Sequence, residues 1–245
     1  MIRMTVEHLR EKNLQKAISG YEKALKTFKK DEFSTQYSEI QLLLGDAYGT
    51  LSEVRDPEAN LQKAIKAYDE ALTVNTKQAF PVDYAAAQNN LGNAYGRLAR
   101  VRDPEANLQK AIKCFEDALT VHTKQAFPVD YAMTQNNLGN TYGDLAEIRD
   151  PEVNFQKAIK AYEEALTVNT KHALPADYAM TQNNLGAAYG DLAEIRDPEA
   201  NLQKAIKCFE DALTVYTQQA FPERHKLVAD NLEEMRERAH TVPPR

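Results

Sequence analysis

A repeat of 47 residues runs through nearly the whole chain and constrains its fold more than any other feature. One phrase, Asn-Leu-Gln-Lys-Ala-Ile with a single Phe variant, begins at Asn13, Asn60, Asn107, Asn154 and Asn201. A second phrase, Leu-Gly-x-x-Tyr-Gly, begins at Leu44, Leu91, Leu138 and Leu185. A fixed period of this length predicts a stack of similar units, each of which buries its apolar side against its neighbours.

Each period predicts two helices. Asp56 precedes Pro57, a good first helical residue, and its carboxylate is expected to cap the free N–H groups of the helix. Apolar residues then follow at steps of three and four from Leu61 to Leu72, which is one face of a helix running to about Thr76. After a short loop over 77–81, a second helix is expected from Asp83 to about Val101, before the cycle restarts.

The whole chain, 1–245, is expected to form one all-α domain of about ten helices, a right-handed α-solenoid of antiparallel pairs. Its periods are 13–54, 55–101, 102–148 and 149–195, followed by 196–240 with a capping helix and by a tail at 241–245. The last helix is polar, with Glu233 and Arg236 where the preceding period has Gly186 and Tyr189. Terminal repeats need such a polar outer face because nothing stacks on them.

These phrases resemble the tetratricopeptide repeat (TPR). Leu91-Gly92-x-x-Tyr95 matches its first helix, Ala111-x-x-x-Phe115-x-x-Ala118 matches its second, and Pro128 follows. The usual Trp is replaced by Gln, as at Gln88, and 47 residues stand in place of the ordinary 34. Longer repeats of this kind resemble those of kinesin light chains and of tandem bacterial and archaeal arrays. The resemblance implies a superhelix whose concave groove, lined by the first helix of each pair, binds protein segments.

The resemblance also implies which residues face that groove, namely those two before and two after each Leu-Gly pair and those one turn further on. The peptide-binding candidates are Asn89, Asn136, Asn183, Asn93, Asn140, Asp46, Arg97, Asp144 and Asp191. These charges lean acidic, so a neutral or basic segment is the expected guest.

Three asparagines suggest a specific mode of recognition. An Asn amide can both donate to and accept from a peptide backbone. Helices packed about 10 Å apart would meet about every third residue of an extended chain that rises about 3.3 Å per residue. We therefore expect a ladder of Asn89, Asn136 and Asn183 along a bound peptide, unless these side chains bond neighbouring helices or solvent instead. The adjoining Asn90, Asn137 and Asn184 are expected to be structural.

Composition argues against several other classes of function. The net charge is -6, whereas a nucleic-acid-binding protein usually carries a basic patch, so we expect no nucleic-acid partner. No apolar run reaches the roughly 20 residues of a membrane span, so no membrane partner is expected. Cys114 and Cys208 share one repeat position and are expected to be buried fillers, and no metal, cofactor or catalytic motif is present. A non-enzymatic, cytoplasmic protein is expected.

Two functions fit this sequence. The first is an adaptor or scaffold that holds an extended partner segment in the concave groove. The alternative is a structural scaffold that associates with itself through the ends of the solenoid, for example as a homodimer through the terminal helices. The first helix bears on the alternative, because it lacks the preceding partner that every later equivalent has, and its apolar face is expected either to dimerise or to pack on a missing neighbour.

Overall fold

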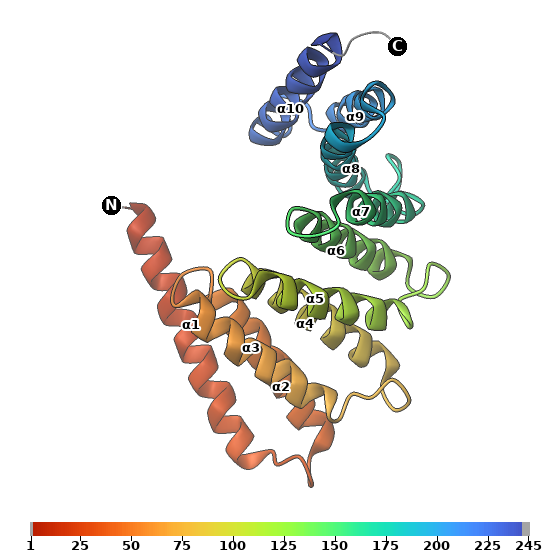
Figure 1. The fold of residues 1–245 in the computed structure, drawn as a ribbon. Helices are drawn as coiled ribbons and strands as arrows, with labels where there is room; N and C mark the ends of the chain where they lie inside the picture. Colours follow the sequence, from red (N-terminus) through yellow and green to blue (C-terminus); the bar gives the residue numbers. More distant parts are fainter. Residues whose placement is uncertain (1, 242–245) are drawn as a thin grey trace. The chain divides into compact units, whose positions relative to one another are not determined.

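The computed structural model describes residues 2–241, and within that range the chain forms ten α-helices and no strands, as predicted. The helices are α1 (Ile2–Thr27), α2 (Ser34–Leu51), α3 (Pro57–Leu72), α4 (Pro81–Ala99), α5 (Pro104–Leu119), α6 (Pro128–Ala146), α7 (Pro151–Leu166), α8 (Pro175–Ile195), α9 (Pro198–Leu213) and α10 (Pro222–Thr241). Figure 1 shows them in chain order. The expected tail falls mostly on 242–245, outside the described residues.

The chain divides into two compact units. The first ends at His122 and contains α1 to α5, and the second begins at Thr123 and contains α6 to α10. In each unit, every helix packs against the next one along the chain. The odd helices α3, α5, α7 and α9 bury an apolar face, which includes the fully buried rings of Phe115 and Phe209. Each unit is therefore a stack of antiparallel helix pairs with its core between the helices.

The turn before each of the helices α3, α5, α7 and α9 lacks the side-chain cap that the sequence predicted. Asp56, Asp103, Asp150 and Asp197 all have positive φ, 43° to 45°, and none makes a side-chain cap hydrogen bond. The carboxylate of Asp56 instead accepts from Nε of Arg55 at 3.0 Å. Asp is one of the few side chains that tolerates this left-handed conformation, which explains why it recurs there.

The asparagine that opens each repeated phrase closes the same turn. Nδ2 of Asn107 donates to the backbone carbonyl of Arg102 at 2.7 Å, and the amide is 5% exposed. Asn60, Asn154 and Asn201 make the equivalent bond at 2.6–2.7 Å. A buried amide without such a partner is costly, so the repeated Asn fixes the path of the chain into each odd helix.

In four of the helix pairs a glycine of the even helix lies against an aromatic ring of the following odd helix. A Cβ on Gly139 of α6 would lie 2.6 Å from Cε1 of Tyr162 on α7. Gly45, Gly92 and Gly186 meet Tyr68, Phe115 and Phe209 in the same way, at 2.5–2.9 Å. Each even helix therefore approaches the following odd helix only because it has no side chain at this point. At the equivalent place α10 carries Glu233, which is exposed.

Replacement of Gly139 by Ala is expected to destabilise the protein by about 1–3 kcal/mol, because the buried Tyr162 ring cannot move away freely. Gly143 lies one turn further along α6 and has no atom within 4 Å of its Cβ position. Gly143→Ala should therefore stabilise the helix by up to about 1 kcal/mol. Urea unfolding of both variants checks this, and equal shifts of the midpoint would contradict the role of the contact.

Replacement of Asn107 by Ala is expected to cost about 1–3 kcal/mol of unfolding free energy, because the carbonyl of Arg102 loses its buried donor. The matched control is Gln109→Ala two residues on, where the exposed side chain bonds only Glu105, and its effect should stay within about 0.5 kcal/mol. Thermal unfolding followed by circular dichroism separates the two variants. A cost at Gln109 as large as that at Asn107 would contradict this interpretation.

Candidate peptide-binding face

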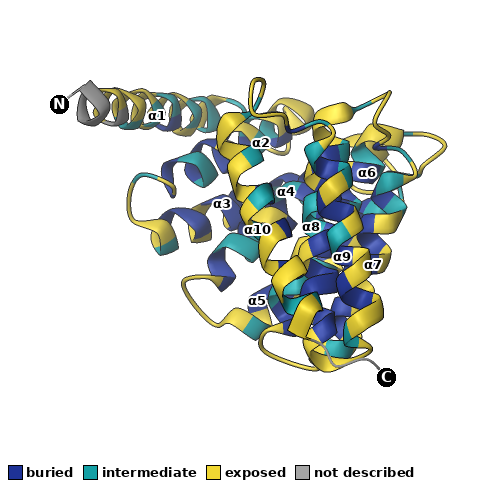
Figure 2. Ribbon diagram, turned by 90° about the horizontal axis from the view of Figure 1, so that it is seen from above, coloured by how far each residue is buried: buried dark blue, intermediate teal, exposed yellow. Residues whose placement is uncertain are grey.

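The even helices of each unit expose one face, and the same repeat positions form it each time. In the second unit, the exposed or half-buried side chains of that face are, on α6, Met133, Asn137, Asn140 and Asp144; on α8, Met180, Asn184, Ala187 and Asp191; and on α10, Leu227, Asn231, Glu234 and Arg238. They recur at steps of three and four, which is one side of a helix. In Figure 2 the outward side of α10 is coloured as exposed along most of its length.

The predicted asparagine ladder is placed one residue away from this face. Asn89 and Asn136 are each only 3% exposed, and Nδ2 of Asn136 donates to Oγ1 of Thr181 on the next even helix at 2.9 Å. Asn183 is half-buried and lies within 3.5 Å of the Asn231 amide. A ligand cannot reach the two buried amides, so the ladder is wrong as a surface feature, and for Asn136 the alternative of a bond between helices holds.

The adjoining Asn90 and Asn184 form bonds between helices, as expected of structural residues, and are also partly exposed. Nδ2 of Asn184 donates to Oδ1 of Asn140 at 3.1 Å, and that oxygen also accepts from the hydroxyl of Tyr162 at 2.7 Å. In the first unit, Asn90 and Tyr68 both donate to Oδ1 of Asp46, at 3.1 Å and 2.6 Å. These amides link successive even helices and remain partly exposed, so both roles coexist.

An apolar row crosses the second unit beside those amides. Met133 on α6, Met180 on α8 and Leu227 on α10 occupy the same repeat position and are 44%, 39% and 58% exposed. Large apolar side chains that line up on a surface mark interaction sites more often than isolated ones do. Met133 and Met180 each stand three positions before an Asn-Asn pair, and this recurrence is the sequence signal that marks the exposed face.

Acidic residues occupy the C-terminal end of the same face on α6 and α8. Asp144 on α6 is half-buried, and Asp191 on α8 is exposed. A glutamate follows each of them three residues later, at Glu147 and Glu194. Partial desolvation of the carboxylate, reinforced by the Glu194 carboxylate, raises the pKa of Asp191, while Arg238 acts in the opposite direction. A cationic group placed here would relieve this repulsion.

In the first unit, a polar pocket of about 250 Å³ lies between α2 and α4. Its lining includes Asp46 and Asn93, both exposed, and Arg97, which is half-buried. Nη2 of Arg97 donates to Oγ of Ser52 at 2.7 Å, and Nη1 lies 3.5 Å from the Glu53 carboxylate. The guanidinium is therefore already engaged, which disfavours its use as a clamp for a ligand carboxylate.

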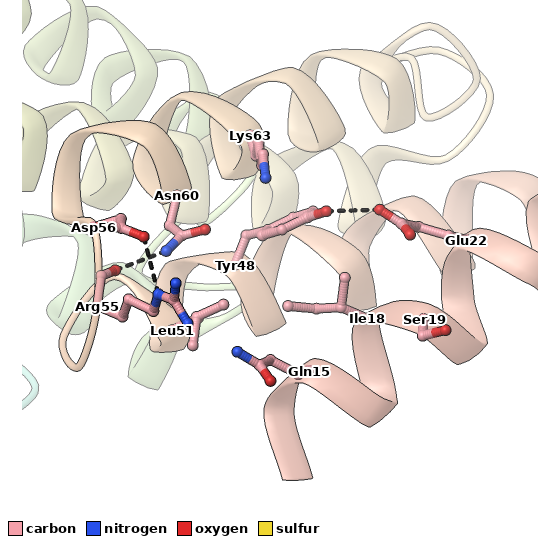
Figure 3. Close-up of a pocket in the computed structure, with 10 residues that line it drawn as sticks. All are labelled: Gln15, Ile18, Ser19, Glu22, Tyr48, Leu51, Arg55, Asp56, Asn60 and Lys63. Atoms are coloured by element: carbon pink, nitrogen blue, oxygen red, sulfur yellow. Dashed lines mark hydrogen bonds and ion pairs between the residues drawn. The ribbon is translucent and has the colours of Figure 1, made fainter. Parts of the chain in front are cut away.

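A larger pocket, of about 380 Å³, lies among α1, α2 and α3 (Figure 3). Its polar groups pair with one another: the hydroxyl of Tyr48 donates to Glu22 at 2.7 Å, and Lys63 lies over the Tyr48 ring at 5.1 Å. Burial and the Glu22 carboxylate raise the pKa of Tyr48 to about 12. The same lysine-over-tyrosine arrangement recurs at Tyr95 and Tyr189, so this pocket belongs to the packing of the repeat.

The chain resembles known proteins in its structure. No protein-family model matches the sequence, and no curated protein matches it. Solved structures do match. The crystal structure of MamA protein matches at 21% sequence identity, over 89% of this chain and 92% of the MamA chain, with a TM-score of 0.57. TTC0263, a thermophilic TPR protein in Thermus thermophilus, matches at 19% identity, 94% and 96% coverage and a TM-score of 0.57. The chain has the tetratricopeptide-repeat fold.

The crystal structure of BtubC (BKLC) from P. vanneervenii also matches, at 18% sequence identity and a TM-score of 0.55. The match covers 95% of this chain and 94% of the BtubC chain. At these identities the likeness concerns the fold, so the site rests on the residues themselves. Among the described residues of this tetratricopeptide-repeat chain, no group of three His, Cys, Asp or Glu side chains could hold a metal ion. No described helix is long and apolar enough to cross a membrane.

Both cysteines of this tetratricopeptide-repeat chain are free and buried. Burial raises the pKa of Cys114 to about 12 and that of Cys208 to about 12, with nearby aspartates adding to the effect. Thiol reagents at pH 8 should therefore label the folded protein roughly 1,000-fold more slowly than the unfolded chain, because the thiolate is the reactive form and its fraction falls by that order when the pKa rises from about 8.5 to about 12. A colorimetric thiol assay with and without denaturant checks this, and complete labelling of the folded protein on mixing would contradict it.

Proposed function

We propose that this protein is a non-enzymatic interaction module that binds an extended protein segment across the exposed face of α6, α8 and α10. The observation that carries the proposal is the row formed by Met133, Met180 and Leu227, three exposed apolar side chains at one repeat position. Removal of such side chains from water on binding is favourable by about 25 cal/mol per Å² of apolar surface. The fold supports the proposal, since TPR proteins generally bind protein partners.

The spacing of the helices suits an extended segment. Helices about 10 Å apart meet an extended chain about every third residue, so successive apolar side chains of the row can each receive one side chain of the partner. The half-buried amides of Asn137, Asn184 and Asn231 lie one turn along the same face and can pair with the backbone of the segment. The proposal therefore retains recognition by asparagine amides and assigns it to the neighbouring residues, Asn137 and Asn184 in place of Asn136 and Asn183.

The acidic end of this face favours a segment that also carries lysine or arginine. Asp144, Glu147, Asp191 and Glu194 contribute four carboxylates within α6, α8 and the turns that follow them. Opposite charges steer association and select partners more than they add affinity. A neutral or basic segment therefore remains the proposed guest, and a cytoplasmic location and the absence of a cofactor remain part of the proposal.

The test is affinity capture from a lysate of the source organism, followed by mass spectrometry. One bait carries Met133→Ser, Met180→Ser and Leu227→Ser, which removes the apolar row without a change of charge. The control bait carries Gln109→Ala, Gln156→Ala and Gln203→Ala, three exposed positions on odd helices. Circular dichroism establishes that both baits are as helical as the unmodified protein.

We expect the serine variant to recover at least tenfold less of a partner than the unmodified and control baits do. This corresponds to a loss of about 1.4 kcal/mol or more of binding free energy. Equal recovery by all three baits would contradict binding at the apolar row. Recovery of the protein itself alone would favour the self-associating scaffold instead, and light scattering would then show a mass that rises with concentration.

A further inference from the structure

One repeat position near the end of the even helices changes its charge from helix to helix. It holds Arg97 on α4, Asp191 on α8 and Arg238 on α10. Within the units, consecutive even helices contact each other directly, α2 with α4, α6 with α8 and α8 with α10. The same junction between two even helices can therefore be compared at three places, with a cation at two of them and an anion at the third.

At two of the junctions, the guanidinium of the later helix binds the end of the earlier one. Nη2 of Arg238 donates to the backbone carbonyl of Gly190 at 2.9 Å and lies 3.3 Å from the Glu194 carboxylate. Nη1 of Arg97 lies 3.5 Å from Glu53, which occupies the same repeat position as Glu194. A cation is favourable here because the last carbonyls of a helix carry partial negative charge. The structure thus contains two filled copies of a guanidinium site.

At the junction of α6 with α8 the chain supplies no such cation. Glu147 occupies the position of Glu194, and Asp191 stands where the arginines stand. Among the described residues, neither Glu147 nor Asp191 has a hydrogen-bond or ion-pair partner. After partial desolvation and the Glu194 carboxylate, Glu147 contributes to the raised pKa of Asp191, and nearby Arg238 does not cancel the effect. Two unpaired carboxylates from successive even helices therefore repel each other at this place.

The space that a guanidinium fills at the next junction is open at this one. A Cβ on Gly190 would lie 3.9 Å from Nη1 of Arg238, whereas the Cβ position of the equivalent Gly143 has no atom within 4 Å. On α8, the small side chain of Ala187 stands where α10 carries Glu234. The junction of α6 with α8 therefore offers the carbonyl and the carboxylate of the filled sites, a second carboxylate, and room for the cation.

We propose that the junction of α6 with α8 binds the guanidinium of an arginine in the partner segment, between Glu147 and Asp191. The guest takes the place that Arg238 takes at the next junction and donates to the Gly143 carbonyl. A guanidinium suits the site better than the ammonium of lysine, because its planar fork can donate to a carbonyl and to carboxylates at once. This inference rests on the proposed function, since it names one residue of the segment proposed to cross this face.

The probe is N-acetyl-arginine amide, titrated into the isotope-labelled full chain and followed by nuclear magnetic resonance. We expect saturable shifts of the backbone amide signals of Gly143, Glu147 and Asp191. The citrulline analogue has the same shape without the charge and should bind at least tenfold more weakly. The lysine analogue should bind at least threefold more weakly than the arginine probe. These comparisons leave the protein unchanged, so they do not depend on the folding of a variant.

The matched protein variants are Asp191→Arg and Glu233→Gln. In Asp191→Arg the chain supplies its own guanidinium, as Arg97 and Arg238 do, so we expect at least tenfold weaker binding of the probe. Glu233 is an exposed carboxylate elsewhere in the same unit, and its replacement should leave the affinity within twofold. Absence of saturable binding to the unmodified protein, equal binding of the citrulline analogue, or unchanged binding by Asp191→Arg would overturn the proposal.

The serine variant of the apolar row separates this inference from the proposed function. Met180 and Asp191 stand about 16 Å apart along α8, so loss of the row should leave binding of the small probe within twofold. Probe binding together with equal partner capture by the unmodified and serine baits would contradict the proposed function and leave the guanidinium site standing. Partner capture that depends on the row, without any binding of the probe, would contradict the guanidinium site alone.

Discussion

The contact of an aromatic ring with a bare helix backbone is the interaction on which the rest of this structure depends. Gly139 admits the Tyr162 ring, and three further pairs repeat the arrangement. Since a ring cannot approach so closely where a Cβ is present, the glycine sets how each even helix packs on the following odd helix. At the equivalent place α10 carries Glu233 instead of glycine.

The turns between pairs convert that packing into a regular surface. Positive-φ aspartates such as Asp103, and the buried amide of Asn107, give every odd helix the same entry. Because pair packing and turns repeat without insertion within each unit, residues at one repeat position come into line across the even helices. This regularity places the apolar side chains equivalent to Met133, and the acidic side chains equivalent to Asp144, in rows across the second unit. The proposed function depends on those rows.

The sequence predicted the ten helices because a strict period, proline starts and an apolar stripe all agree. It predicted the ends of the helices less well: α3 stops at Leu72 and not near Thr76, since Thr73 bonds back to the carbonyl of Glu70. For Asn89 and Asn136 the expected register fell one residue away from the exposed face of the even helices. In an Asn-Asn pair the two side chains point about 100° apart around the helix. The register was taken from the shorter family repeat, and it selected the buried Asn89 where the partly exposed residue is Asn90. The partners of Arg97 depend on side-chain packing that no spacing rule contains.

Methionine oxidation offers the most direct test of the proposed binding face. Met133 and Met180 are 44% and 39% exposed, while Met235, on α10 of the same unit, is 6% exposed and serves as an internal control. Limited peroxide treatment with mass-spectrometric readout, with and without a partner captured from the lysate, reports all three positions at once. We predict rapid oxidation of Met133 and Met180 in the free protein, at least fivefold protection of both in the complex, and slow oxidation of Met235 in both states. Undiminished oxidation of Met133 and Met180 in the complex would contradict binding at this face.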